Sequence, residues 1–391
     1  MHRGQTGSFS IANFGSEAVR AFVPLPLPPR PPLALAGTLQ QLLESAALAL
    51  GRLDSVSTLL PDEDLFLYAY VRKEAVLSSQ IEGTQSSLSD LLLFELEEAP
   101  GVPQHDVHEV ANHVAALDHG LRLVRQGLPL SNRLICEIHQ VLLANDHAGT
   151  KTPGAFRRSQ NWIGGSRPGN AVFVPPPYAV VPDCMADLER FLHAENDGLS
   201  VLLRAGLAHV QFETIHPFLD GNGRVGRLLI TLMLCAAGLL RNPLLYLSLY
   251  LKQHRTRYYD LLTHVRETGD WEEWLTFFLE GVRLTAEGAV STARRLAKMF
   301  QDHRDHIQDS CGRKAGSVLR VHDELRQRTI VSLPVASRET QLSFRTVSLA
   351  MELLVALRMA REITGKRRNR LFVYDQYLAI LNEGTETPFQ S

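Results

Sequence analysis

Apolar residues recur with the period of an α-helix through most of this chain. The first apolar stripe begins after Thr38 and runs through Leu39, Leu42, Leu43, Ala46 and Leu50. The same character returns in several further stretches: 65–84, 88–96, 107–123, 134–143, 185–192, 199–212, 228–234 and 277–300. The pattern therefore predicts a mainly α-helical protein.

Two stretches interrupt the helical pattern. Residues 1–37 carry Gly, Ser and a proline cluster, which cannot hold a helix and predicts a segment that runs extended along the surface. Residues 153–182 are divided by Gly and Pro pairs that bound two short runs, 161–164 and 171–174. Two such runs around a Gly-rich turn predict a β-hairpin, with a packed surface loop as the alternative.

Composition places the chain among ordinary globular proteins. Its 391 residues are too many for one core, so two or three domains are expected. No run reaches the ~18 apolar residues of a membrane helix, and the first twenty residues lack a secretory apolar core, so neither a membrane nor export is expected. The cysteines have neither metal spacing nor a disulfide framework, which fits a reducing cytoplasm: Cys136, Cys184, Cys235 and Cys311.

Residues 221–227 have the composition of a phosphate site. The Gly221-Asn222-Gly223 triplet lets backbone N–H groups approach an anion, and the apolar run behind it supplies a helix whose positive end faces that anion. Arg224 and Arg227 lie three residues apart, so both can project from one side of the helix and hold different phosphate oxygens.

Two further groups stand just before this triplet. Asp220 offers a hard oxygen ligand of the kind that Mg²⁺ uses beside a nucleotide, and His216 changes its charge near neutral pH. Each feature alone has an ordinary structural explanation, such as a turn, a core histidine or a solvated helix face. No packing requirement asks for all of them within twelve residues, so together they indicate a site.

The stretch 216–227 also resembles the motif of the Fic family, His-Pro-Phe-x-Asp-Gly-Asn-Gly-Arg-x-x-Arg, at every specified position. The resemblance implies a helical fold that transfers AMP from ATP to a protein hydroxyl, with His216 as general base, Asp220 as Mg²⁺ ligand and Phe218 as a buried anchor. The nucleotide-binding set that it implies is Gly221, Asn222, Gly223, Arg224, Val225, Gly226 and Arg227.

A second motif lies near the end of the predicted helix 65–84. Ser78 and Glu82 are one turn apart, and Gly83 is suited to end the helix, although a polar helix end is the simpler interpretation. In Fic proteins Ser/Thr-x-x-x-Glu-Gly/Asn marks an inhibitory helix. The resemblance implies that Glu82 pairs with Arg227 and obstructs the γ-phosphate of ATP, which places the chain in the class with an N-terminal inhibitory helix.

The resemblance also implies which residues contact the target protein and the adenine ring. A flap over the active site registers the target segment by strand pairing, and Asn161, Trp162, Ile163 and Gly164 take that place here. Tyrosines flank the adenine in relatives, which makes three residues candidates for stacking: Tyr250, Tyr258 and Tyr259.

The last region differs from the rest in charge. Residues 313–374 contain 13 Lys and Arg against 5 Asp and Glu, while the whole chain has a formal charge of −2. Three predicted helices (318–325, 337–342 and 346–357) and a basic hairpin over 361–374 resemble a winged helix. This composition favours DNA binding through 313–374, and the alternative is a module that docks protein or dimerises.

These observations predict a Fic-type helical bundle with a small β-hairpin flap, followed by a winged-helix domain. The expected organisation is a Pro-rich segment 1–37, a helical region 38–150, a catalytic core 151–285, a connecting helix 286–312, the winged helix 313–380 and a tail 381–391.

The expected activity is Mg²⁺-dependent transfer of AMP from ATP to a Ser, Thr or Tyr of an unidentified target protein, or of the chain itself. The alternatives are a DNA-binding regulator whose Fic domain senses nucleotide, AMP removal by the same site, and another nucleotide donor. A homodimer is suggested by analogy alone.

Overall fold

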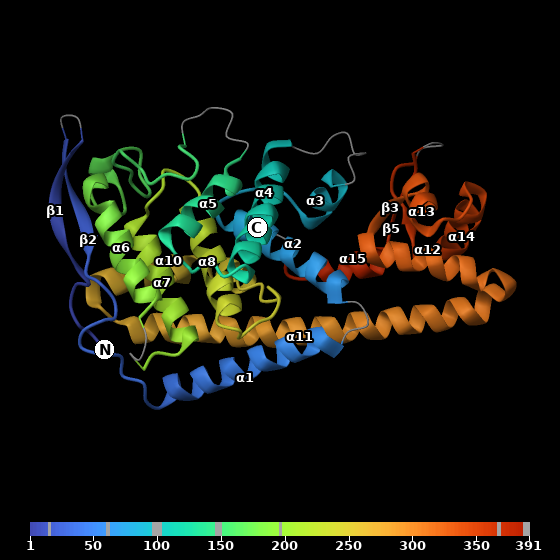
Figure 1. Cartoon of the computed structure of the whole chain (residues 1–391), viewed down its shortest axis with the longest axis horizontal. Helices are drawn as coiled ribbons and strands as arrows, with labels where there is room; N and C mark the ends of the chain where they lie inside the picture. Colours follow the sequence, from blue (N-terminus) through green and yellow to red (C-terminus); the bar gives the residue numbers. More distant parts are fainter. Residues whose placement is uncertain are drawn as a thin grey trace.

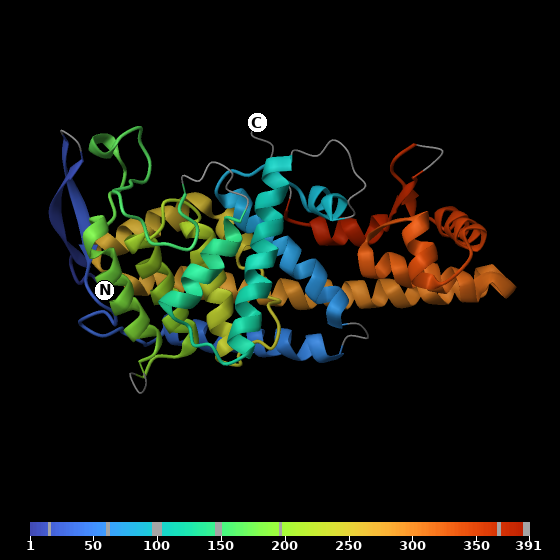
Figure 2. The same cartoon turned by 45° about the horizontal axis from the view of Figure 1, so that its top comes forward.

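A computed structural model describes residues 1–14, 17–59, 63–95, 104–144, 151–194, 198–365 and 369–385. One long helix, α11 (Trp271–Cys311), runs along most of the molecule, and α1 (Thr38–Leu59) packs beside it (Figure 1). A β-hairpin lies at one end of the molecule and a small helical module at the other (Figures 1 and 2). The predicted mainly α-helical fold is confirmed.

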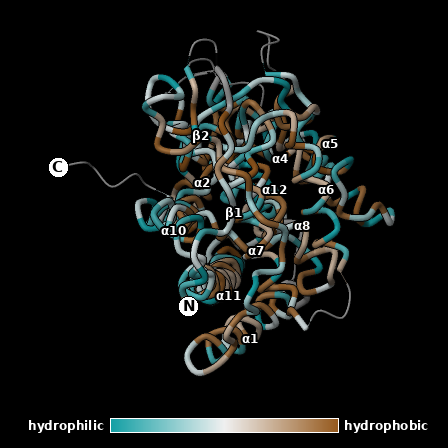
Figure 3. Tube along the Cα trace, turned by 90° about the vertical axis from the view of Figure 1, so that its left-hand side faces the viewer, coloured by the Kyte–Doolittle hydropathy of each residue, from teal (hydrophilic) through white to brown (hydrophobic). Residues whose placement is uncertain are grey.

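The middle of the molecule is a helical bundle around two apolar helices. Almost every residue of α7 (Val201–Ile215) and α8 (Asn222–Ala236) is buried, which is the pattern of a helix enclosed on all sides. Seen along the molecule, α7 lies between α11 and the rest of the bundle, and α1 lies outside α11 (Figure 3). The surrounding helices are α2 (Glu63–Ile81), α3 (Leu88–Phe94), α4 (Gln104–Arg125), α5 (Asn132–Leu142), α6 (Val181–Leu192), α9 (Ser248–Gln253) and α10 (Arg255–Thr268). None of the helices in the described ranges is long and apolar enough to cross a membrane.

The N-terminal segment differs from its prediction. Instead of one extended strand of chain, β1 (Gly7–Phe14) and β2 (Glu17–Pro24) form an antiparallel hairpin. Val19, Ala21 and Val23 occupy every second position, and this spacing is typical of a strand. The proline cluster that follows drew the prediction toward an extended segment instead. Phe22 N donates to Val174 O at 2.9 Å, so the hairpin is attached to the predicted flap.

The flap is less regular than a β-hairpin. Ile163 and Phe173 form a single antiparallel bridge, and the segment otherwise contains two short 3₁₀ turns, η1 (Pro168–Asn170) and η2 (Tyr178–Val180). The two predicted runs do lie opposite one another. Because the prolines at 175–177 lack N–H groups, they cannot extend the ladder beyond this bridge.

The C-terminal module contains the three predicted helices and the predicted hairpin. Its sheet has the order β3–β5–β4, with both pairs antiparallel. The second helix begins at Leu333, earlier than predicted, because Ser332 caps it and Pro334 is tolerated in a first turn. Lys366, Arg367 and Arg368 of the predicted basic tip lie outside the described residues. The elements are η3 (Gly312–Lys314), α12 (Ala315–Arg328), β3 (Ile330–Ser332), α13 (Leu333–Thr340), α14 (Phe344–Ala356), β4 (Arg361–Glu362), β5 (Leu371–Val373) and α15 (Asp375–Asn382).

The end of the C-terminal module returns to α2, the helix that directly precedes Glu82. The buried Lys73 of α2 donates to the carbonyl of Glu383 at 2.9 Å. Lys252 of α9 donates both to Gln80 Oε1 of α2, at 2.7 Å, and to Thr385 O, at 2.9 Å. Residues 383–385 are therefore linked to α2 at Lys73 directly and at Gln80 through Lys252.

Candidate active site

The predicted motif forms the loop between α7 and α8. His216 ends α7 in the left-handed conformation (φ 50°, ψ 60°), and Gly221 caps α8 with φ 74°. The buried Asn222 side chain closes the loop, because its Oδ1 accepts from Phe218 N at 2.8 Å and its Nδ2 donates to Phe218 O at 2.9 Å. Phe218 is fully buried, as expected of an anchor. The loop is thus held in one shape by its own residues.

His139 of α5 holds the loop from outside. Its ring stacks on Phe218 with a centroid distance of 3.7 Å, and burial lowers its pKa to about 4, so the imidazole is neutral. Since Nδ1 accepts from Gly154 N at 2.9 Å, the ring proton lies on Nε2, which donates to Asp220 O at 3.1 Å. The sequence around His139 does not reveal this role, because a histidine on an apolar helix is more often an ordinary core residue.

Arg157 joins the flap to the same loop. It is buried, and it donates from Nε to His216 O at 3.0 Å and from Nη2 to Pro176 O at 2.5 Å. Asn161 adds a bond from Nδ2 to Phe218 O at 3.0 Å. The flap is therefore positioned over the loop by side-chain donors.

The other predicted flap residues shape the flap. Trp162 packs against the N-terminal hairpin with Val19 and Val174, Ile163 forms the bridge to Phe173, and Gly164 turns with φ 68°. Among the described contacts, Asn161 is the member of this set that reaches the loop 216–221 directly.

His216 has the protonation state of a base. Burial, assisted by the positive charge of Arg157, lowers its pKa to about 4, although the Glu213 carbonyl opposes the shift. The imidazole is therefore neutral at physiological pH and can accept a proton.

Asp220 lies at the mouth of the site as a carboxylate. Burial alone would raise its pKa, but the hydrogen bond from Lys151 and the charge of Arg224 outweigh burial and lower it. Lys151 Nζ lies 2.7 Å from Oδ2, and Arg224 Nη2 lies 3.7 Å from Oδ1. About a third of the Asp220 side chain, 36%, is exposed. One accessible, ionised carboxylate fits Mg²⁺, which takes its remaining ligands from water and phosphate.

Glu82 occupies the N-terminal end of α8. Its Oε1 accepts from Arg227 Nη2 at 2.7 Å, and its Oε2 accepts from Arg224 Nε at 3.0 Å. A Cβ placed on Gly223 would lie 2.4 Å from Glu82 Oε1, so the carboxylate rests directly against the backbone of the first helical turn. The predicted contact with Arg227 is present, and Arg224 is a second partner that the sequence did not predict.

Both arginines are fixed in buried positions. Arg224 and Arg227 are 2% and 3% exposed. Ser78 accepts from Arg227 Nε through its hydroxyl at 2.7 Å and from Nη2 through its carbonyl at 2.9 Å. Burial alone would lower the pKa of Arg227, but the Glu82 carboxylate outweighs burial and raises it. Gly83, with φ 107°, lies two residues beyond the end of α2 at Ile81.

Four residues of the predicted nucleotide set lie elsewhere. Val225 is in the core, and Gly226 faces the buried Glu213 of α7, so both serve helix packing. Tyr258 is 1% exposed, with its hydroxyl 2.8 Å from His209 Nε2, and Tyr250 is 6% exposed. Neither tyrosine presents a free ring face to an adenine, because aromatic density in a helical sequence does not reveal which way a ring points. Tyr259, the third candidate, is 38% exposed.

The fold and the site define a helical protein with a glycine-containing loop between two buried helices. An acidic residue just beyond the end of a third helix pairs with two buried arginines beside this loop. Comparison with known proteins agrees. The profile described as "Fic/DOC family N-terminal" matches residues 40–122, and the profile "Fic/DOC family" matches residues 129–234. Residues 40–122 and 129–234 thus match the two domains described for the Fic/DOC family.

Curated relatives are similar over about half of this chain. The protein adenylyltransferase Fic of Culex quinquefasciatus is 32% identical over 214 residues, which are 53% of this chain and 39% of the relative. A probable protein adenylyltransferase of Aquifex aeolicus is 30% identical over 188 residues, or 47% of this chain and 55% of the relative. The chain thus spans well under two thirds of the length of these relatives.

Solved structures share the fold over a larger part of the chain. A Fic family protein from Desulfovibrio desulfuricans G20 superposes with a TM-score of 0.58 at 20% identity, covering 88% of this chain and 98% of its own. A Fic domain containing signaling protein from Bacteroides thetaiotaomicron VPI-5482 has a TM-score of 0.52 at 20% identity and covers 67% of this chain and 97% of its own.

Proposed function

We propose that this chain is a protein adenylyltransferase that transfers AMP from ATP to a protein hydroxyl and is inhibited by its own Glu82. The observation that carries the proposal is the Glu82 carboxylate, an anion seated at the N-terminal end of α8 between two buried arginines. A site that holds a carboxylate in this way is suited to phosphate oxygens, which need the same donors and the same positive end of a helix.

The phosphate chain of ATP takes the anion place in this proposal. Arg224 and Arg227 already point at one site from the same helix, so they lose little freedom on binding a phosphate. Gly223 has no side chain, which leaves room beside the first turn of α8. Asp220 would hold Mg²⁺, which supplies charge neutralisation on the phosphate oxygens.

His216 stands at the other end of the same loop. As a neutral imidazole it takes the proton of the acceptor hydroxyl while that oxygen forms a bond to the α-phosphorus. The bond between the α-phosphorus and the oxygen that bridges to the β-phosphate breaks, and pyrophosphate leaves with the electron pair. Arg157 and His139 keep the loop in place during this exchange, because they bind the carbonyls of His216 and Asp220.

Glu82 would oppose this reaction by competition. Its carboxylate satisfies both arginines in the absence of ATP, so a phosphate that needs these donors has to displace it. Nucleotide then binds in a position displaced from the productive one, or it has to wait for α2 to move. The proposal therefore includes low activity in the resting protein.

The acceptor would approach through the flap. The flap is tied to the catalytic loop by Arg157 and Asn161, and a bound peptide that follows its backbone would be held close to His216. Backbone pairing encodes little of the partner's sequence, so the target is an unidentified protein or a second site on this chain.

DNA stays outside the proposal because of the surface of α14. A helix that binds in a DNA groove presents polar and basic side chains, whereas Phe344, Leu349 and Val355 of α14 are 55%, 44% and 38% exposed. Arg345 is the one basic residue of α14.

The test uses purified protein, Mg²⁺ and ATP labelled at the α-phosphate. The proposal expects label on the protein, more of it in Glu82→Gly and none in the double variant Glu82→Gly with His216→Ala. Absence of label from Glu82→Gly, with a lysate as a source of acceptors, contradicts the proposal.

A further inference from the structure

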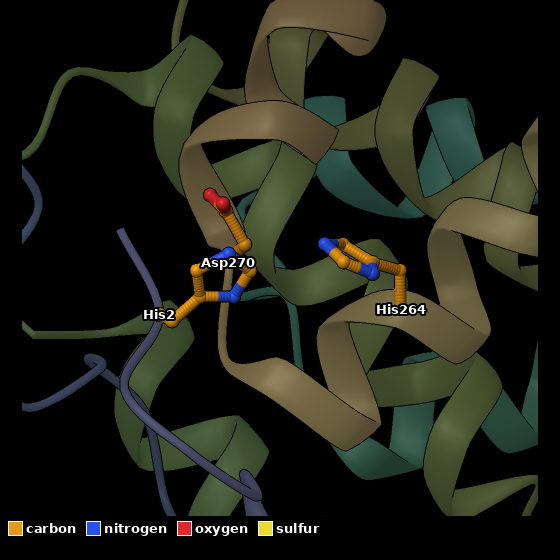
Figure 4. A group of neighbouring side chains, drawn as sticks. All are labelled: His2, His264 and Asp270. Carbon is orange, nitrogen blue, oxygen red and sulfur yellow. The ribbon is translucent and has the colours of Figure 1, made fainter.

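The N-terminal segment brings a histidine to the junction of α10 and α11. Ligand atoms of His2, His264 and Asp270 all lie within 4.8 Å of one another. His264 belongs to α10, and Asp270 is the residue that caps α11. Figure 4 shows one ring nitrogen of His264 turned toward the other two residues. His2 comes from the N-terminal segment, and Asp270 lies just before α11.

The position of His2 is fixed by its neighbours along the chain. Arg3 N and Gly4 N both donate to Thr268 O, at 2.8 and 2.9 Å, and Thr6 N donates to Arg266 O at 3.1 Å. The Arg3 side chain is 3% exposed and forms two bonds with Glu272. A terminal segment held by so many bonds does not bring its histidine to this place by chance fraying.

We propose that His2, His264 and Asp270 form a binding site for a divalent transition metal ion, with Zn²⁺ as the best match. Two imidazoles and one carboxylate are a common three-residue ligand set for zinc, which then takes water as its fourth ligand. Imidazole nitrogens favour zinc over Mg²⁺, which prefers oxygen. The site shares no residue with the loop that carries Asp220 and does not depend on the proposed transferase activity.

The existing contacts of the three residues are compatible with this role. Asp270 accepts from the α-amine of Met1 at 2.9 Å and from Glu273 N at 3.2 Å, so a metal would replace the amine as the cation on this carboxylate. Glu273 lies 3.2 Å from His264 Nε2 and adds negative charge beside the site, although Arg257 also pairs with it. The rings of His2 and His264 meet edge to face with centroids 5.8 Å apart, so a modest rotation brings both to one ion.

A metal here would fasten the N-terminal hairpin. Residues 1–6 lead directly into β1, and β2 donates to the flap through Phe22 N. Zinc binding therefore holds the start of the hairpin to the α10–α11 junction, near Phe22, which pairs with Phe9 and is the point where the flap is attached.

The experiment is a calorimetric titration of the full chain with ZnCl₂ after removal of metals, in buffer that contains millimolar Mg²⁺. We expect one site that Mg²⁺ does not displace, and at least tenfold weaker binding in His2→Ala and in His264→Ala. Asp270→Asn is also weaker, and it keeps the cap of α11 because asparagine caps helices well. His193→Ala removes an exposed histidine elsewhere and serves as the matched control.

Two further measurements make the result specific. Co²⁺ in place of Zn²⁺ should give visible absorption from nitrogen and oxygen coordination that both histidine variants lose, and Zn²⁺ should slow proteolysis of residues 1–24. The proposal is overturned if His2→Ala and His264→Ala each bind Zn²⁺ as tightly as the wild type does. It is also overturned if, of the three histidine variants, the control His193→Ala alone loses Zn²⁺ binding.

Discussion

Replacing Glu82 with glycine removes the carboxylate that satisfies Arg224 and Arg227. The two contacts, of 2.7 and 3.0 Å, are hydrogen bonds between charged groups. Such bonds contribute about 1.5–3 kcal/mol each, and the low end applies because 27% of the Glu82 side chain is exposed. Displacing Glu82 thus costs nucleotide about 3 kcal/mol, which corresponds to roughly hundredfold.

The expected result is a rise of roughly two orders of magnitude in the rate of self-labelling at an ATP concentration below saturation. The assay follows label from ATP at the α-phosphate into the protein over time. Glu82→Gln tests the charge alone, because it keeps the shape of the side chain, and it should give an intermediate rate. Gln85→Gly, in the exposed segment just after α2, controls for added backbone freedom.

The same change has a second, independent consequence for stability. Arg224 and Arg227 stay buried after Glu82 is removed, and a buried cation without its partner is costly. Glu82→Gly should therefore melt at a lower temperature than the wild type, and ATP with Mg²⁺ should raise its melting temperature more than that of the wild type. A labelling rate within threefold of the wild type, together with an equal response to ATP, would refute the reasoning.

Four further outcomes follow from the geometry. His216→Ala in the Glu82→Gly background should lose labelling while keeping its ATP-induced rise in melting temperature, and loss of both would make His216 a binding residue. Lys151→Ala removes the cation 2.7 Å from Asp220, so it should lower the Mg²⁺ concentration needed for half-maximal ATP binding, whereas an unchanged requirement would show that the lysine does not compete. Lys252→Ala removes one of the two links between α2 and residues 383–385, since Lys73 still donates to the Glu383 carbonyl, and should raise labelling by less than Glu82→Gly does; a decrease would contradict this. Burial lowers the pKa of His209 to about 3, so between about pH 6.5 and pH 3 the unfolded chain binds a proton at this imidazole and the folded chain does not. The free energy of unfolding, measured with denaturant, should therefore fall by ~2 kcal/mol from pH 7 to pH 5 from this residue alone. A flat profile would contradict the assignment.

The helical architecture was readable because helix period, caps and breakers act locally. Each predicted helix of the bundle appears, but the helix predicted over 277–300 is longer than expected. It runs from Trp271 to Cys311 and includes the stretch 286–312 that was predicted as a separate connecting helix. The N-terminal hairpin was not predicted, since its buried residues Val19 and Ala21 pack against Val174 of the flap, which lies far away in the sequence. A proline-rich neighbourhood hides a hairpin whose apolar face is buried only by a tertiary contact with the flap.

The candidate site was readable only in part. His216, Asp220 and the arginines stand in one stretch, and Glu82 has a recognisable neighbourhood. The second contact, between Glu82 and Arg224, depends on the rotation of α2 against α8, which no local pattern specifies.

The orientation of side chains also explains why Tyr258 was predicted to contact the adenine and why the role of His139 was not predicted. Tyr258 has an aromatic ring that could stack on a base, but its hydroxyl points at His209 inside the core. His139 looks like any core histidine, and its bonds to Gly154 and Asp220 become visible only when α5 is placed beside the loop.

The central claim is that the loop between α7 and α8 directs attack at the α-phosphate. The most direct test is to incubate Glu82→Gly with ATP labelled either at the α-phosphate or at the γ-phosphate and to measure the label retained by protein. The account predicts retention of the α-label alone, abolished by His216→Ala. Retention of the γ-label, or of neither label, would contradict it.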